Sequence, residues 1–198
     1  MQCVLCRNKE CLWGKNCSII KSELEYSEKE KKVLQASSLF QAGTERKTKL
    51  EEIVVYAKKM EYSKIGIAFS IECESEARLA YDILSRYFEV FSVCCNVCGF
   101  GKEQFGIPKN GTSEFEAACN PRGQALLLNG DRAELNLMLG LDAINEIIFS
   151  EKSDAPAVSL PVGELLSLRE GRASPVEENT ARKHPEFQKK HAVRTKWV

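Results

Sequence analysis

The feature that most constrains the fold of this chain is an alternation of short β-rich apolar runs with helical stretches. Parallel strands need a covering crossover between them, and a strand that is buried on both faces is continuously apolar. The alternation predicts an α/β fold: a small doubly wound, mostly parallel sheet of about four strands, Rossmann-like or flavodoxin-like. The runs predicted as strands are Lys64–Ser70, Glu89–Cys94, Glu134–Leu139 and Ala157–Leu160.

Three helix starts are marked by capping residues. Thr48 and Glu51 have the spacing of a capping box in front of an apolar stripe that we expect to pack on the sheet. Asn120 stands before Pro121, the usual order of an N-cap residue and a proline at the first helical position. Asp142 is a candidate N-cap for the helix that follows the third strand.

Composition and charge place the chain among ordinary globular proteins. Its 198 residues are 43% hydrophobic, enough for one principal core. Lysine plus arginine equals aspartate plus glutamate at 28 each, so nucleic acid is disfavoured as a partner. The first residues carry no signal peptide, and the chain has no apolar run of about 18 residues, so we expect a cytoplasmic protein without membrane contact.

The chain divides into four predicted parts: a cysteine-rich metal-binding segment (1–20), a helical lead-in (21–62), an α/β core domain (63–170) and a polar, basic C-terminal tail (171–198). The tail is either a solvated end or a contact arm for a protein partner or RNA. Both histidines, His184 and His191, lie in this tail, so no catalytic histidine is expected in the core.

Four of the nine cysteines crowd the amino terminus, where Cys3, Cys6, Cys11 and Cys17 form C-x2-C-x4-C-x5-C. Four thiolates so close in sequence surround one metal centre at little cost in loop entropy, and both zinc and a four-iron cluster accept four of them. One compact run, in place of two separated pairs, moves the expectation slightly toward an iron-sulfur cluster. The alternative is four reduced, unliganded thiols on a leader.

The other five cysteines, Cys73, Cys94, Cys95, Cys98 and Cys119, fall in the predicted α/β domain. Ligands of parallel sheets bind outside the carboxyl ends of the strands, so several of these sulfurs are expected to meet on one edge. Cys119 stands directly before a helix start, where free amides and the helix dipole are expected to favour its thiolate.

Two chemistries fit these central residues. Cys94 or Cys95, with Cys98 and Cys119, could hold a second metal or iron-sulfur centre that Asp142 or Cys73 completes. Alternatively, Cys95 and Cys98 form a C-x-x-C pair after a strand, the layout of a dithiol redox couple. Simpler readings are a buried Cys94, an inert Cys73 at a helix start and an Asp142 that only caps a helix. Nucleotide cofactors are disfavoured because no phosphate-binding loop appears.

The chain resembles the uncharacterised cysteine-rich metal-binding family catalogued as domain of unknown function 1847. The resemblance runs from about residue 1 to 179 through TKLEEIVVYAKKMEYSKIGIAFSIECESEARLAYDIL, FSVCCNVCGFGKEQFGIPK, ACNPRGQALLLN, ELNLMLGLD, APAVSLPV and GRASPVE, with the four leading cysteines. It implies metal binding in a protein of anaerobic bacteria and archaea, with no reaction assigned.

This chain departs from the family pattern at two places. The family places a cysteine where Ser70 stands, and a cysteine with a G-H-D sequence where this chain reads GLDAIN after the third strand. The resemblance therefore implies a central site that has lost some ligands and gained Cys98. Cys94 or Cys95, and Cys119, stay at family-like positions.

Three functions follow as hypotheses. The first is a cytosolic metal-binding protein for redox, sulfur or metal handling, with zinc or a four-iron cluster on the amino-terminal cysteines and a cysteine-lined edge on the α/β domain. The second is a redox or sulfur-transfer enzyme that uses the central cysteines. The third is an accessory subunit that docks on a larger complex through its tail. Whether the protein is an enzyme is left open by the sequence.

Overall fold

The structure is a computed structural model that describes residues 2–17, 26–41 and 48–169. Its helices are α1 (Glu28–Gln41), α2 (Lys49–Lys59), α3 (Glu74–Leu84), α4 (Pro121–Gly130), α5 (Ala143–Lys152) and α6 (Val162–Arg169). Its strands are β1 (Lys64–Phe69), β2 (Glu89–Cys94), β3 (Leu135–Leu139) and β4 (Ala157–Leu160). The predicted tail, with His184 and His191, lies outside the described residues.

The four strands form one sheet in the order β2-β1-β3-β4, and every neighbouring pair is parallel. This order is that of a flavodoxin-like sheet without its fifth strand. The predicted fold class is therefore confirmed, and all four strands lie within one residue of their predicted bounds. The winding direction reverses between β1 and β3, so the ligand crevice of such folds is expected at their carboxyl ends.

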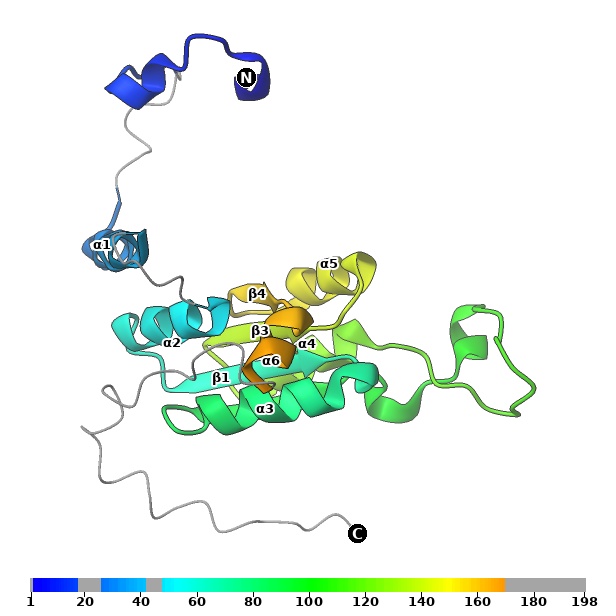
Figure 1. The fold of residues 1–198 in the computed structure, drawn as a ribbon. Coiled ribbons are helices and arrows are strands. Elements are labelled where there is room, and N and C mark those ends of the chain that lie inside the picture. Colours follow the sequence, from blue (N-terminus) through cyan, green and yellow to red (C-terminus); the bar gives the residue numbers. More distant parts are fainter. Residues whose placement is uncertain (1, 18–25, 42–47, 170–198) are drawn as a thin grey trace.

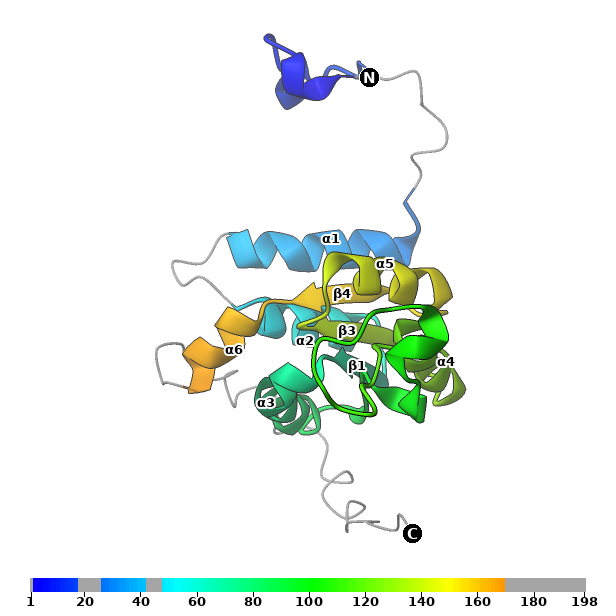
Figure 2. The ribbon, with the colours of Figure 1, turned by 90° about the vertical axis from the view of Figure 1, so that its right-hand side faces the viewer.

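Helices cover both faces of the sheet. Figure 2 shows α4 and α5 on one side of the strands, with α2, α3 and α6 on the other. Alternate side chains of β1 serve the two layers: Ile65 and Ile67 pack with α2, α3 and α6, and Ala68 packs with α4 and α5. Because both faces are covered, the central strands are mostly apolar, as the sequence pattern predicted, with Asn136 of β3 as a buried polar exception.

All three predicted helix caps are confirmed. The Thr48 side chain accepts from the Glu51 amide, and the Glu51 carboxylate accepts from the Thr48 amide at 2.7 Å. Asn120 accepts from the Gly123 amide, and Asp142 accepts from the two amides at the start of α5. The apolar face of α2 packs in the core, as predicted, although α2 falls within the predicted lead-in 21–62.

A buried glutamine holds α4 against the ends of β1 and β2. Gln124 is fully buried, and its Nε2 donates to the carbonyl oxygens of Phe69 (3.2 Å) and Val93 (2.9 Å). At the sheet centre, a Cβ on Gly66 would lie 2.0 Å from Oδ1 of Asn136, so only glycine fits there. The two hydrogen bonds of Gln124 set the distance between α4 and the edge where the strands end.

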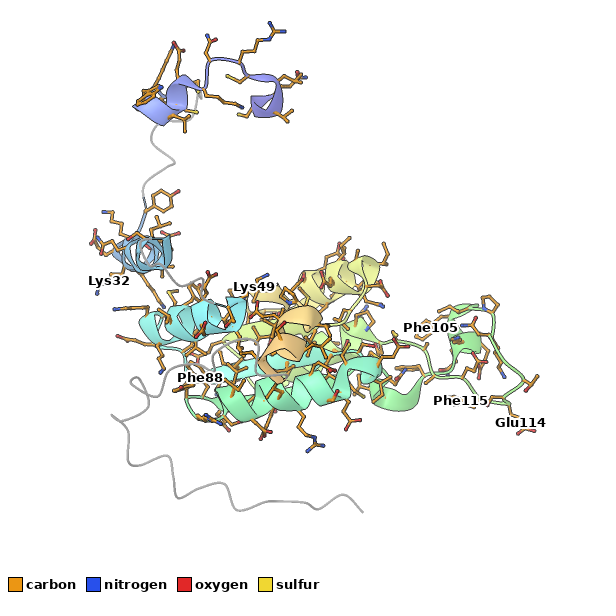
Figure 3. All side chains as sticks on the ribbon, viewed as in Figure 1. Lys32, Lys49, Phe88, Phe105, Glu114 and Phe115 are labelled. Atoms are coloured by element: carbon orange, nitrogen blue, oxygen red, sulfur yellow. The ribbon has the colours of Figure 1, made fainter. Side chains whose placement is uncertain are left out.

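Two parts of the chain extend from the sandwich. Residues 2–17 form two 3-10 turns, Cys3–Leu5 and Glu10–Trp13, in which no residue is buried, and they lie apart from the sheet in both views. Residues 99–117, here called the lobe, project beyond β2 and carry Phe105 and Phe115 at the surface (Figure 3). No helix in the described ranges has both the length and the apolar character needed to cross a membrane.

Candidate functional site

Loops from three strands meet at the carboxyl edge of the sheet. After β1 the chain enters a 3-10 turn, Ile71–Cys73, and the Ser70 amide donates to the Leu139 carbonyl oxygen at 2.9 Å. That hydrogen bond joins the ends of β1 and β3 at the reversal point of the sheet. Doubly wound folds bind their ligands at this edge of the sheet, and it is here that the cysteines described next gather.

Cys95 lies at the centre of this edge. Its side chain is 3% exposed, and its Sγ accepts from the Ile71 amide at 3.4 Å. The thiol donates to Oδ1 of Asn96 at 3.4 Å, and the Cys95 carbonyl oxygen accepts from the Asn120 amide at 2.6 Å. One residue thus connects the loop after β1, the loop after β2 and the start of α4.

Cys119 lies close enough to Cys95 for the Cys95 thiol to act on its pKa. Desolvation, the Cys95 thiol and the carboxylates of Asp142 and Glu72 raise the pKa of Cys119 to about 11. The expectation that the helix start favours the Cys119 thiolate is therefore wrong. Desolvation of the sulfur is the largest cause, and the Cys95 thiol, Asp142 and Glu72 add to it, while the Asn120 side chain already accepts from the Gly123 amide at the helix start.

Cys73 is the third sulfur of the edge. It is half-buried at the start of α3, and desolvation, followed by Glu76, Glu72 and Cys95, raises its pKa. A Cβ on Gly140 would lie 2.3 Å from the Cys73 Sγ, so the sulfur packs directly on the turn after β3. The sequence favoured an inert thiol at this helix start, and the raised pKa agrees with that reading, while Cys95 lies close enough to contribute to the shift.

Cys94 and Cys98 occupy different positions. Cys94 ends β2 opposite Phe69, and Cys98 is exposed with a φ of 70°. In the described part of the chain, neither thiol is hydrogen-bonded to another cysteine. The pair that the structure brings together is Cys95 with Cys119, not the C-x-x-C pair of Cys95 with Cys98.

The electrostatic surroundings of the three sulfurs are acidic. Besides desolvation and neighbouring thiols, the groups that act on the pKa values of Cys73 and Cys119 are the carboxylates of Glu72, Glu76 and Asp142. Asp142 caps α5, as predicted, and also acts on Cys119. Such a site favours a bound cation over a bound anion.

The donor types fit a thiophilic metal, since thiolates and carboxylates are ligands of zinc and thiolates hold iron-sulfur clusters. Over residues 2–17, 26–41 and 48–169, no three histidine, cysteine, aspartate or glutamate side chains are arranged to hold an ion as they stand. Metal binding therefore stays a prediction both for Cys3, Cys6, Cys11 and Cys17 and for the central cysteines.

A cavity of ≈ 380 Å³ lies elsewhere, between α1, α2 and the strands β3 and β4. Its lining includes Val33 of α1, Tyr56 of α2 and Val158 of β4, and no described cysteine. We place the site at the carboxyl edge because the reactive groups gather there.

The lobe beside Cys119 is held by one acidic residue that the sequence did not single out. Glu116 pairs with Lys102 at 2.8 Å and accepts from the amides of Asn110 (2.9 Å) and Gly111 (2.6 Å). Together these contacts lower the pKa of Glu116 to about 2. Gly140 and Gln124 were also not predicted from the sequence as part of the site. Of the two, only Gly140 had a usable signal, because it directly follows a predicted strand.

Comparison with known proteins identifies the family. Residues 12–160 match the family model described as "Protein of unknown function (DUF1847)", a span that includes Cys17 and the five central cysteines. An uncharacterised protein of Methanocaldococcus jannaschii is 43% identical over 167 residues, which cover 82% of this chain and 86% of that protein. No solved structure matches. The chain therefore belongs to the DUF1847 family of proteins of unknown function.

Proposed function

We propose that this protein is a cytosolic metal-binding protein that serves redox, sulfur or metal handling through its cysteines. The observation that carries this proposal is the position of Cys95 at the carboxyl edge, close enough to Cys73 and to Cys119 to raise the pKa of each, with Glu72 acting on both thiols and Asp142 on Cys119. Sulfur and carboxylate donors from separate loops form a site that is rich in potential negative charge.

The raised pKa values support a cation as the ligand. Without a cation, the Cys119 thiol keeps its proton at neutral pH, because its thiolate would be desolvated and would also stand near the Cys95 thiol and the carboxylates of Asp142 and Glu72. A bound zinc or iron ion reverses this effect, since a coordinating thiol is deprotonated. Metal binding at the edge would accordingly release protons and draw the three loops closer together.

The amino-terminal cysteines are the second part of the proposal. Residues 2–17 expose Val4, Leu5, Leu12 and Trp13 and bury no side chain, so they have no hydrophobic core of their own. Very small units of this kind commonly gain their folding free energy from a metal. Cys3, Cys6, Cys11 and Cys17 are proposed to hold zinc or a four-iron cluster.

Metal analysis of anaerobically purified protein tests the proposal. We expect visible absorption and about four irons per cluster if the centre is a cubane, or zinc without colour. Replacing Cys11 and Cys17 together by serine should remove the amino-terminal metal, and Cys95→Ser with Cys119→Ser should remove metal from the edge. Cys98→Ser is the matched control, because Cys98 is exposed and bonded to no other described thiol. Wild-type protein without stoichiometric transition metal would overturn the proposal.

The Cys95–Cys119 contact favours one second candidate, a thiol redox couple. Two thiols would become one disulfide, and the two electrons and two protons would pass to a small-molecule disulfide. The raised pKa of Cys119 opposes this function, since the thiolate is the attacking species. One hyper-reactive thiol at neutral pH in an alkylation map would favour redox chemistry, whereas protection by bound metal would favour the first proposal. Docking through residues 171–198 stays a prediction outside the described residues.

A further inference from the structure

The outer surface of α4 and α5 carries a group of exposed aliphatic side chains, here called the α4–α5 face. Its members are Leu126 (52% exposed), Leu127 (45%), Ile144 (65%), Ile147 (55%) and Ile148 (37%). On α5 the core is reached by Phe149, Ile144 and Ile147 lie on the opposite side of the helix, and Ile148 lies at the border between the two sides. Exposed aliphatic residues gathered on two neighbouring helices are typical of an interaction surface.

The two helices of this face run side by side in the same direction. Each returns from the carboxyl end of one parallel strand to the start of the next. Their last turns are joined, because Nδ2 of Asn129 donates to the Lys152 carbonyl oxygen at 2.8 Å and the Asp154 amide donates to Oδ1 of Asn129 at 3.0 Å. The face is therefore a fixed pair of parallel helices.

Charges on the two helices have opposite signs. Residues 121–132 carry two arginines and one aspartate, whereas residues 142–154 carry four carboxylates and one lysine. If a two-fold axis runs along the two helices in the plane between the facing copies, α4 of one copy lies parallel to α5 of the other. Arg122 at the start of α4 then lies at the level of the acidic first turn of the opposing α5, and Arg132, after the end of α4, lies at the level of Glu151.

We infer that the α4–α5 face binds a second copy of this chain and forms a symmetric dimer. The surface is complementary to itself, with aliphatic side chains at its centre and opposite charges at its ends, as an isologous interface requires. The inference does not rest on metal binding, since the face contains none of the cysteines.

Sedimentation or light scattering of the full chain tests the dimer, with reductant and chelator present to prevent links through cysteines. We expect wild-type protein across the micromolar range to have twice the mass of one chain. Ile144→Glu with Ile147→Glu should halve that mass. Phe105→Glu in the lobe is the matched control, because Phe105 is as exposed (54%) as Ile147 and lies off the face. Thermal unfolding by circular dichroism confirms that each variant is folded.

A charge-reversal cycle tests the two-fold arrangement. Arg132→Glu and Glu151→Arg should each raise the dimer dissociation constant about tenfold, and the double variant should restore it, because the pair is remade with exchanged signs. A monomeric wild-type protein would overturn the inference, including the case in which residues 170–198 cover the face. A dimer that persists in the variant with Ile144→Glu and Ile147→Glu would also overturn the inference. So would a wild-type dimer that forms only when the chelator is left out.

Discussion

At the scale of single residues, Gly140 leaves the space that the Cys73 sulfur occupies in the candidate site. Its φ is +68°, a conformation that side chains other than glycine adopt at a cost, and a Cβ there would lie 2.3 Å from the Cys73 Sγ. Backbone conformation and close packing thus coincide at one position, directly after β3.

Replacing Gly140 by alanine should therefore destabilise the protein and displace Cys73. We expect a loss of about 2 kcal/mol in the free energy of unfolding, from the strained φ and the steric contact together. Urea denaturation measures it, and faster alkylation of Cys73 should accompany it. Gly106→Ala is the control, because Gly106 has a φ of +67° with nothing within 4 Å. Equal losses in the two variants would show that the Cys73 contact costs nothing.

The pKa of Cys119 gives a second prediction at this scale. Because the pKa is raised from 9.0 to about 11, the thiolate fraction near neutral pH should be about a hundredfold below that of an ordinary thiol. Cys95→Ala removes the largest neighbouring contribution, so alkylation of Cys119 in metal-free protein should become faster and its pH profile should move to lower pH. An unchanged profile would mean that Cys95 does not act on Cys119.

At the scale of elements, the lobe depends on the ionised form of Glu116. The pKa of Glu116 falls from 4.5 to about 2 on folding, so its contribution to stability is complete above pH 4.5 and is lost as the pH falls toward 2. Glu116→Gln should therefore open the lobe already at neutral pH and flatten the pH dependence between these values. Hydrogen exchange at the Asn110 and Gly111 amides measures the opening. Glu114→Gln is the control, because Glu114 accepts a hydrogen bond from Lys109 of the lobe through its carbonyl oxygen and not through its side chain. Similar exchange in both variants would contradict the role of Glu116.

Elements with local signals were predictable, and contacts between elements were not. The caps at Thr48, Asn120 and Asp142 are hydrogen bonds between residues two or three positions apart, so the sequence contains both partners together. The Cys119 thiol, by contrast, is governed by Cys95 and Asp142, which lie more than twenty positions away in either direction along the chain. A helix start was therefore found correctly while its effect on the neighbouring thiol was mistaken.

At the scale of the whole molecule, the amino-terminal segment should be thermodynamically separate from the sandwich. None of residues 2–17 is buried, so the core clusters of the sheet contain no side chain from this segment. Serine at Cys11 and Cys17 should leave the main thermal unfolding transition unchanged within about 1 °C, because these substitutions leave the edge of the sheet intact. The digestion rate of the segment by a protease should rise at the same time. A large fall in the main transition would show that metal in this segment supports the α/β domain.

The sequence by itself determined the fold class, because apolar runs of strand length separated by helices leave few arrangements other than a covered parallel sheet. It also determined which residues begin three of the helices, α2, α4 and α5. Only the tertiary structure decided which sulfurs meet, because strand order, not spacing along the chain, brings the loops after β1, β2 and β3 to one edge. Cys95 therefore pairs with Cys119, twenty-four positions away, and not with Cys98, three positions away.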